Sequence, residues 1–326
     1  MSERLERRQR VLSDRIARYE RLVEIRALED AAHRIFTEGH GHGITHTCHG
    51  QEAVAVGIAS ALPPSDHVAC TYRGHGMGLA LGLTPEEVLA ELLGKRTGCT
   101  HGLGGSMHLV GWDVGMLPTF AIVGAGIPVA AGMGWASRYL GADDIGVAVF
   151  GDGAANIGAF HEGLNLAAIW NLPVLFICEN NLYGEYTRMN LTTPVESIAE
   201  RGTAYRMPAE VVDGQDVEAV AAAVGEAAKH VRTGDGPRLL EVRTYRYTGH
   251  VHSDPAPYRP EGELEQWQER DPVELFERRL REEGVLDDAG VDAIRGEVAD
   301  RIQAAEDAAF AADYPDVGEM FRHVYA

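Results

Sequence analysis

The residues best suited to chemistry lie in one stretch, GDGAANIGAFHEGLNLAAIWNLPVLFICENN, which ends at Asn181. A short apolar run over 147–150 predicts a buried strand before GDG, and a second run over 174–178 predicts another strand before the paired asparagines. The spacing of apolar residues over 156–171 predicts the helix that connects them. This unit places Asp152 and Asn181 at the carboxyl ends of neighbouring parallel strands, where α/β proteins bind ligands.

A carboxylate and an amide oxygen that face each other suit a small, hard cation. Mg²⁺ prefers octahedral oxygen ligands and rarely takes all of them from protein, so it usually keeps phosphate oxygens as partners. The competing interpretation is that GDG is only a turn and that the asparagines belong only to a loop, since both patterns are common between elements. Each short pattern by itself leaves both interpretations open.

Two more polar residues follow predicted strands. Arg73 comes after a strand predicted over 67–71, and its planar guanidinium matches the geometry of phosphate oxygens. His250 comes after a strand predicted over 239–245. A single arginine in such a place is more often part of a surface salt bridge, and a single loop histidine is more often only solvated. All four polar residues follow strands that should end at one edge of the sheet, so we expect one shared site.

The composition of the 326-residue chain limits its possible partners. A formal net charge of −20 argues against sequence-independent binding to nucleic acid or to an anionic membrane, because both need a basic surface. No secretory signal opens the sequence and no uncharged apolar run is long enough to span a bilayer, so we expect a soluble, cytoplasmic protein. The four cysteines show no CxxC spacing and are expected to be reduced thiols: Cys48, Cys70, Cys99 and Cys178.

The order of predicted elements indicates an α/β fold with a three-layer, doubly wound, mostly parallel sheet. We expect residues 1–37 to form a charged, amphipathic helical arm that lies on a neighbour, and residues 38–265 to form the α/β domain. Residues 266–326 should form a helical tail packed on that domain. The tail closes with apolar side chains, which predict a docked end: Phe321, Val324 and Tyr325.

Glycine-rich segments interrupt this pattern at three places. Residues 38–50 contain several histidines, but alternating His-Gly lacks the spacing of a rigid zinc site, so a mobile loop at the mouth of a site is favoured over a metal. Residues 94–108 are expected to form a flexible loop and do not match a phosphate-binding P-loop. The Gly-x-Gly within 122–134 fails to match a dinucleotide fingerprint. The histidines of the first segment are His40, His42, His46 and His49.

Several motifs spread along the chain resemble those of one family. They are HGQEA at 49–53, YRGHG at 72–76, HGLGGSMH at 101–108, IVGA at 122–125 and TYRYTGHVHSDP at 244–255, together with the GDG-to-NN block. The sequence is similar to the alpha subunits of the two-chain thiamine-diphosphate 2-oxo acid dehydrogenases, of the pyruvate and acetoin types. Transketolases share the GDG block, whereas the YRGHG and GHxxSDP pieces belong to the dehydrogenase branch. The resemblance runs from about Tyr19 to about Asp313.

This resemblance implies thiamine diphosphate as the cofactor and Mg²⁺ as the ion that holds it. It implies that the Mg²⁺ ligands are the side chains of Asp152 and Asn181 and the backbone carbonyl of Tyr183. It implies that the aminopyrimidine ring of the cofactor lies along the backbone of Ile122 and Val123. The residues that it implies against the diphosphate are Tyr72, Arg73, Gly153, Ala154 and His250.

The resemblance also implies two catalytic histidines. His250 matches a loop histidine that touches the diphosphate and the reacting substrate, and His46 matches a second histidine at the channel. Histidine suits these roles because it can donate to a developing alkoxide and can move protons near neutral pH.

The implied activity is thiamine-dependent decarboxylation of a 2-oxo acid, with pyruvate favoured, and transfer of the acyl group to a lipoyl acyltransferase. In this family the glutamate that activates the aminopyrimidine belongs to the beta subunit. The sequence shows no second domain that could supply it. We therefore expect the chain to be inactive alone and to work in a two-alpha, two-beta heterotetramer.

Some residues depart from the family pattern and keep alternatives open. Phe120 and Ala121 stand where pyruvate-type relatives have Asn-Gly, so acetoin remains an alternative substrate. The run 253–255, Ser-Asp-Pro, is closer to the pyruvate-type loop and favours a 2-oxo acid. Val251 stands where animal pyruvate enzymes carry a phosphorylated serine. Two other functions remain open. One is a thiamine-dependent carboligase or hydrolase that works without a lipoyl partner, and the other is a cofactor-binding subunit without activity.

Overall fold

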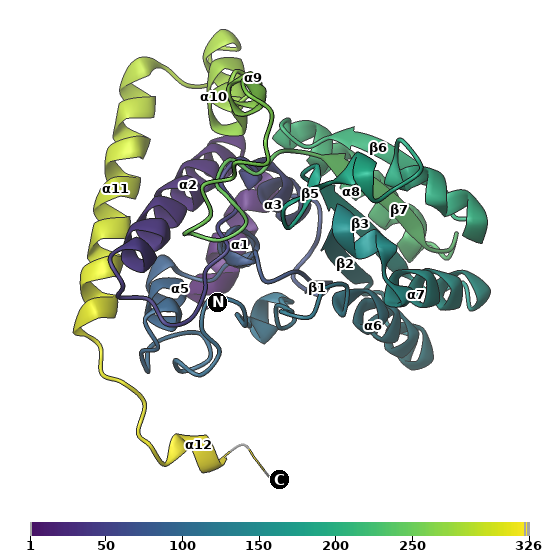
Figure 1. Cartoon of the computed structure of the whole chain (residues 1–326), viewed down its shortest axis with the longest axis horizontal. Helices are drawn as coiled ribbons and strands as arrows, with labels where there is room; N and C mark the ends of the chain where they lie inside the picture. Colours follow the sequence, from purple (N-terminus) through teal and green to yellow (C-terminus); the bar gives the residue numbers. More distant parts are fainter. Residues whose placement is uncertain (1, 323, 325–326) are drawn as a thin grey trace.

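The computed structural model describes residues 2–322 and residue 324. Its centre is a five-stranded sheet in which all paired strands are parallel, in the order β1-β2-β3-β7-β6 (Figure 1). This confirms the predicted α/β fold with a parallel sheet. The strands of the sheet are β1 (His67–Ala69), β2 (Gly146–Gly151), β3 (Val174–Asn180), β6 (Ala209–Asp213) and β7 (Arg238–Arg243), and a separate antiparallel pair consists of β4 (Tyr183–Gly184) and β5 (Thr187–Arg188).

Helices surround the sheet, and α7 (Gly158–Ile169) lies within the range 156–171 that the apolar spacing predicts. The helix expected over 156–171 is shorter, because a 3₁₀ segment, η2 (Asp152–Asn156), begins within GDG and ends at Asn156. Ile157 then takes up an extended backbone conformation before α7 begins at Gly158. The helices are α1 (Glu3–Ser13), α2 (Arg15–Thr37), α3 (Glu52–Ala59), α4 (His75–Leu81), α5 (Pro85–Leu92), α6 (Gly126–Leu140), α7 (Gly158–Ile169), α8 (Val217–Arg232), α9 (Glu263–Gln268), α10 (Pro272–Glu282), α11 (Asp288–Ala311) and α12 (Glu319–Arg322), with further 3₁₀ turns η1 (Trp112–Val114), η3 (Met189–Leu191) and η4 (Ile198–Tyr205).

Alternating side chains of the central strands divide the apolar core into two parts. In β2, Val147 and Val149 pack with residues of α3 and α8, whereas Ala148 and Phe150 pack with residues of α6 and α7. This alternation follows from the geometry of a strand, in which successive side chains point to opposite faces. Helices therefore cover both faces of the sheet, as Figure 1 shows.

The N-terminal segment consists of two helices, α1 and α2, which separate at Asp14. The backbone of Asp14 is extended, and its side chain accepts a hydrogen bond from the Ile16 N–H at the start of α2. Helix α2 belongs to the core of this chain, because Tyr19 and Leu22 are fully buried among residues of α3 and α5. The apolar stripe of residues 1–37 was expected to lie on a neighbour, but in α2 it packs against other helices of the same chain.

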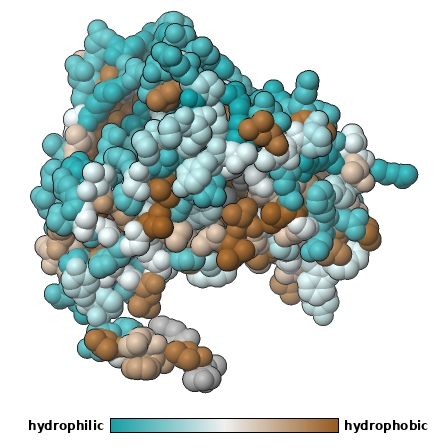
Figure 2. Space-filling view, in the orientation of Figure 1, coloured by the Kyte–Doolittle hydropathy of each residue, from teal (hydrophilic) through white to brown (hydrophobic). Residues whose placement is uncertain are grey.

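The C-terminal helices α10 and α11 add to the same core, to which Phe276 contributes. Beyond α11 the chain leaves the body of the protein and reaches α12 (Figure 1). Figure 2 shows hydrophobic side chains on this projecting segment, where Phe321 is 71% exposed and Val324 is 58% exposed. The prediction that the apolar side chains at the C-terminal end are docked is therefore wrong for Phe321 and Val324 in the isolated chain. The third predicted side chain, Tyr325, lies outside the described residues.

All four cysteines are free, and three of them are buried. Among the described residues, no helix combines the length and the apolar character needed to cross a membrane.

Candidate functional site

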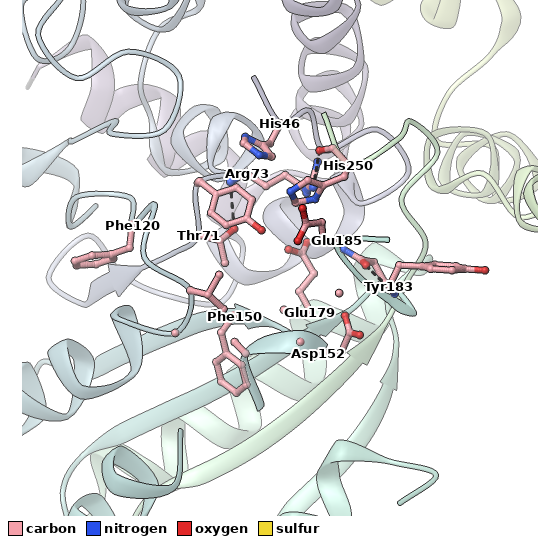
Figure 3. Close-up of a pocket in the computed structure, with 18 of the residues that line it drawn as sticks. His46, Thr71, Arg73, Phe120, Phe150, Asp152, Glu179, Tyr183, Glu185 and His250 are labelled. Carbon is pink, nitrogen blue, oxygen red and sulfur yellow. Dashed lines mark hydrogen bonds between the residues drawn. The ribbon is translucent and has the colours of Figure 1, made fainter. Parts of the chain in front are cut away.

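A pocket of about 500 Å³ lies at the carboxyl ends of β2 and β3 (Figure 3). The structure brings every predicted site residue to its lining, although these residues come from segments far apart in the sequence. Those that follow strands meet because these strands end at one edge of the parallel sheet. His46, Ile122 and Val123 instead reach the pocket on loops that follow helical segments. The predicted residues in the lining are His46, Tyr72, Arg73, Ile122, Val123, Asp152, Gly153, Ala154, Asn181, Tyr183 and His250.

Asp152 directly follows β2 and is only 2% exposed. Burial raises the pKa of its carboxyl to about 6, although the backbone N–H groups of Asp152 and Gly153 and the charge of Arg246 favour the ionised form. No side-chain cation among the described residues forms an ion pair with this carboxylate. A bound cation would supply the positive partner that the ionised group lacks.

Gln51 fixes the orientation of Asn181. Asn181 Nδ2 donates to Gln51 Oε1 at 2.8 Å, and Asn181 Oδ1 accepts from the Tyr183 N–H at 3.3 Å. The amide oxygen therefore lies on the side of the loop that leads to Tyr183. Sequence reasoning missed this role of Gln51, although the residue stands inside the HGQEA motif, where a polar residue at the start of a buried helix was the available signal.

The GDG turn and the β4–β5 hairpin approach each other at the level of the backbone. A Cβ added to Gly153 would lie 3.2 Å from Gly184 Cα, and one added to Gly184 would lie 3.2 Å from Gly153 Cα. A Cβ added to Gly151 would meet no atom within 4 Å. This part of the pocket wall is backbone, so a ligand can come close to peptide N–H groups.

Arg73 connects two other walls of the pocket. Its Nη1 donates to the Thr47 carbonyl at 2.5 Å, and its Nη2 donates to the His250 carbonyl at 3.3 Å. The guanidinium also faces the pocket. In a chain with a net charge of −20, it provides a local positive centre for an anionic ligand.

The rings of His46 and His250 meet edge to face, with centroids 4.9 Å apart. In Figure 3 they lie on the opposite side of the pocket from Asp152. Burial, followed by the charge of Arg73, lowers the pKa of His46 to about 3 and the pKa of His250 to about 4. Both rings are therefore neutral at pH 7, and each can donate one proton and accept another.

Arg246 sets the tautomer of His250, and sequence reasoning missed it. Arg246 Nη1 lies 3.4 Å from His250 Nδ1, and since a guanidinium can only donate, the neutral ring carries its proton on Nε2. The backbone of this loop is held by Asp254, whose Oδ2 accepts from the His250 N–H at 2.6 Å and from the Tyr258 hydroxyl at 2.7 Å. An arginine three residues beyond a buried strand, in the motif that carries His250, was the signal that could have identified Arg246.

Glu179 is a second pocket residue without a predicted role. It lies in β3 and lines the pocket between Arg73 and Asp152 (Figure 3). Burial raises the pKa of its carboxyl to about 7, while the charge of Arg73 acts in the opposite direction. Sequence reasoning assigned a role to an asparagine of the ENN motif and none to Glu179, although Glu179 belongs to the same motif.

The remaining histidines of segment 38–50 have separate neighbours. The ring of His40 packs on Phe310, and the Nε2 of His49 lies 3.0 Å from Asp30 Oδ1. Within the described part of the chain, no cluster of three or more His, Cys, Asp or Glu side chains is found that could hold a metal ion through such side chains alone.

Comparison with known proteins places the chain in one family. A family model described as dehydrogenase E1 component matches residues 20–318. The alpha subunit of the acetoin:2,6-dichlorophenolindophenol oxidoreductase of Bacillus subtilis is 41% identical over 308 residues, which cover 94% of this chain and 92% of that protein. The pyruvate dehydrogenase E1 component subunit alpha of Rhizobium meliloti is 40% identical over 312 residues, which cover 95% of this chain and 90% of that protein.

A third relative, the testis-specific mitochondrial pyruvate dehydrogenase E1 alpha subunit of Homo sapiens, is 38% identical over 310 residues, which cover 94% of this chain and 79% of that protein. The family match extends from α2 to the segment before α12 and therefore includes every strand of the sheet and every loop of the pocket. The chain therefore belongs to the dehydrogenase E1 component family, among the alpha subunits of thiamine-diphosphate-dependent pyruvate and acetoin dehydrogenases.

Proposed function

We propose that this chain is the alpha subunit of a pyruvate-type 2-oxo acid dehydrogenase, which decarboxylates its substrate and passes the acyl group to a lipoyl acyltransferase. Thiamine diphosphate, which the family implies, supplies when bound the carbon centre that carries the acyl group. One observation carries the proposal. Oxygen ligands of Asp152, Asn181 and Tyr183 share a single pocket with Arg73 and His250.

The donor set of the pocket fits Mg²⁺ and a diphosphate. A carboxylate of Asp152, the amide oxygen of Asn181 and the carbonyl of Tyr183 are hard oxygen ligands of the kind that Mg²⁺ prefers. Because only one of them is charged, the ion would depend on phosphate oxygens from the cofactor. Arg73 and the glycine backbone at Gly153 offer donors to the same phosphates.

The two histidines would handle protons at the reacting atoms. With Arg246 against its Nδ1, His250 presents its Nε2–H as a hydrogen-bond donor, which suits a substrate oxygen that gains negative charge. His46 lies against both His250 and Tyr72 and would line the path by which substrate enters. Their neutral state at pH 7 is what this role requires.

Acetoin is the alternative substrate, and Phe120 is the observation that favours it. Phe120 and Ala121 line the pocket immediately before Ile122 (Figure 3). An aromatic ring offers no hydrogen bond to the carboxylate of a 2-oxo acid, whereas it can pack against the methyl groups of acetoin. The two relatives with pyruvate and acetoin in their names are almost equally similar to this chain, so identity does not separate the substrates.

An E1 alpha subunit implies a beta subunit, and we propose that it completes the pocket on its open side. Ile122 and Val123 line the pocket yet are 73% and 46% exposed. Helix α6 begins at Gly126 and continues this apolar surface to Trp135 and Tyr139, whose rings stack with centroids 5.3 Å apart and remain exposed. The surface is thus continuous with the mouth of the pocket. We call these four side chains, at 122, 123, 135 and 139, the α6 surface.

The finer features of the assembly are also proposals. We propose a two-alpha, two-beta heterotetramer that works with a lipoyl acyltransferase. A cytoplasmic location is proposed from the bacterial relatives, while other relatives carry mitochondrial or chloroplastic in their names.

Co-expression of this chain with its beta subunit tests the proposal. The purified assembly is supplied with thiamine diphosphate and Mg²⁺, and reduction of an artificial electron acceptor is measured with pyruvate, branched 2-oxo acids and acetoin. The proposal predicts the highest kcat/KM for pyruvate and no turnover by either subunit alone. A preference for acetoin would establish the alternative, and turnover without thiamine diphosphate would refute both.

A further inference from the structure

A buried carboxylate in α2 connects segments that form the pocket. Glu29 is 0% exposed and lies outside the pocket lining. Its Oε1 accepts from the Cys48 N–H at 2.8 Å, and its Oε2 lies 2.8 Å from His75 Nδ1. One carboxylate therefore bridges the segment that carries His46 and the helix that follows Arg73.

The chain of hydrogen bonds continues beyond His75. His75 Nε2 lies 2.8 Å from Ser106 Oγ, and the Ser106 hydroxyl donates to Thr45 Oγ1 at 3.0 Å. The path thus starts at Glu29, crosses the HGLGGSMH loop at Ser106 and returns to the segment next to His46. All four side chains in the path are buried, so water does not compete for these bonds.

Each anchored segment supplies a side chain to the pocket. His46 lies between Thr45 and the Cys48 N–H, Arg73 lies two residues before His75, and Met107 follows Ser106. We propose that Glu29 is a positioning residue of the active site, which acts through His75 and Ser106 to hold these three pocket segments in register.

The loop that contains Ser106 is stiff enough to be positioned in this way. Glu91, which is fully buried, accepts hydrogen bonds from backbone N–H groups at four positions of the loop, with distances of 2.8–3.0 Å. The flexible loop expected for 94–108 is therefore wrong over this part, because a carboxylate organises its backbone. The four donors are Thr100, Gly102, Gly104 and Gly105.

Two other roles for this chain of residues fail on geometry. Ser106, His75 and Glu29 have the order of a hydrolytic triad, but the Ser106 side chain is buried and lies outside the pocket lining, so no substrate reaches its hydroxyl. Glu29 is also unsuited to exchange a proton near neutral pH. Burial would raise the pKa of Glu29, yet His75 and the hydrogen bonds to the carboxylate outweigh burial and lower it to about 2.

Helix α2 offers a matched control in Glu24. This carboxylate is 1% exposed, and its pKa is also lowered to about 2, because several arginines outweigh the effect of burial. Its partners lie on α1, α2 and α11 and not on a pocket segment. They are Arg7, Arg21 and Arg301.

The test compares Glu29→Gln and Glu24→Gln in the chain co-expressed with its beta subunit. Hydrogen exchange of backbone amides over 45–48 and 101–108 is measured by mass spectrometry, together with Tm, kcat and KM at saturating cofactor. We expect both variants to lower Tm. Only Glu29→Gln should speed exchange over both segments, by about tenfold or more, and lower kcat by about tenfold, since small misplacements of catalytic groups have large effects on rate.

Equal exchange and equal kcat in the two variants would overturn the proposal, since Glu29 would then contribute only to stability. Ser106→Ala provides a second variant that removes no charge and should fold even where Glu29→Gln does not. It should speed exchange over 101–108, and unchanged exchange there would also contradict the proposal. The kinetic readout rests on the proposed function, whereas the exchange readout needs no substrate, so a failed substrate screen leaves this test intact.

Discussion

The side chains of Asp152 and Asn181 enter one pocket from neighbouring parallel strands. Asp152 follows Gly151 at the end of β2, and Asn181 directly follows β3, where Glu179 is the register partner of Gly151. Because both strands point the same way, their carboxyl ends form a common edge with a carboxylate and an amide oxygen side by side.

The Mg²⁺ affinity of the assembled enzyme should depend on the ionisation of Asp152. Burial raises the pKa of this carboxyl to about 6, so in the cofactor-free enzyme it takes up a proton as the pH falls through 6. The raised pKa means that ionised Asp152 destabilises the cofactor-free fold above pH 6, and a bound cation removes this cost. Affinity should be constant above about pH 7 and should fall about tenfold per pH unit well below 6.

Calorimetry of Mg²⁺ binding in the presence of thiamine diphosphate, at pH 5 to 7.5 and in two buffers of different ionisation enthalpy, checks this dependence. About one proton should be released at the acidic end and none at pH 7.5. An affinity that is flat across this range would contradict the role of Asp152.

Gln51→Leu should weaken Mg²⁺ binding by about tenfold while the fold is kept. The substitution removes the acceptor that holds Asn181 Nδ2, so the amide oxygen of Asn181 loses its fixed orientation. Gln215→Leu is the control, because Gln215 is also fully buried but accepts from Thr244 outside the pocket. Calorimetry on both variants in the assembled enzyme measures the difference, and equal affinities would refute the orienting role.

His250→Ala should leave cofactor binding nearly unchanged and lower kcat by about 100-fold or more, the range expected for loss of a proton-transferring side chain. His252→Ala is the matched control, because this loop histidine packs on Phe36 and does not line the pocket. Steady-state kinetics and thiamine diphosphate calorimetry together check the prediction. Full activity of His250→Ala would exclude the histidine from the reaction.

The pH profile of kcat should also lack a step near 6.5. Burial and the charge of Arg73 lower the pKa of His250 to about 4, so protonation of the neutral ring begins only well below pH 6. Stability behaves differently, because the ring in the unfolded chain already takes up a proton near 6.5. The stability that the neutral, buried ring contributes is therefore lost progressively as the pH falls from about 6.5 toward 4. A step near 6.5 that disappears in His250→Ala would contradict this assignment.

Trp135→Ser and Tyr139→Ser should weaken assembly with the beta subunit. These side chains lie on the α6 surface, and their stacked rings are exposed in the isolated chain, so their loss should leave the Tm of the chain alone nearly unchanged. Trp112→Ser is the control, since Trp112 is 63% exposed in η1, away from the pocket lining. Analytical ultracentrifugation of the mixed subunits measures the effect. Unchanged association would place the interface elsewhere.

Sequence reasoning was most successful where a motif is local. Asp152 and Asn181 each stand within three residues of the end of an apolar run, so the strand-end rule was enough to place both. Arg73 and His250 were found in the same way, by treating four strand ends as one edge. The predicted residues that follow strands reach the pocket for this reason, whereas His46, Ile122 and Val123 were identified only through the family resemblance.

Contacts between distant segments could not be predicted. Gln51 and Asn181 are separated by 130 positions, and the local sequence around either residue does not indicate that the other is its hydrogen-bond partner. The apolar stripe of α2 showed that a partner was needed but not that the partner was the chain's own core. The same pattern in the tail at Phe321 has no cover among the residues that the structure describes. Apolar spacing specifies a buried face but leaves open what buries it.

Asp152→Ala tests whether the GDG-to-NN edge holds thiamine diphosphate through a cation. Thiamine diphosphate is titrated with Mg²⁺ into the assembled wild type, Asp152→Ala and the control Asp144→Asn, which lies before the opposite end of β2. The account predicts that Asp152→Ala weakens binding by about 100-fold or more, while Asp144→Asn leaves it unchanged. Wild-type affinity in Asp152→Ala would contradict the account.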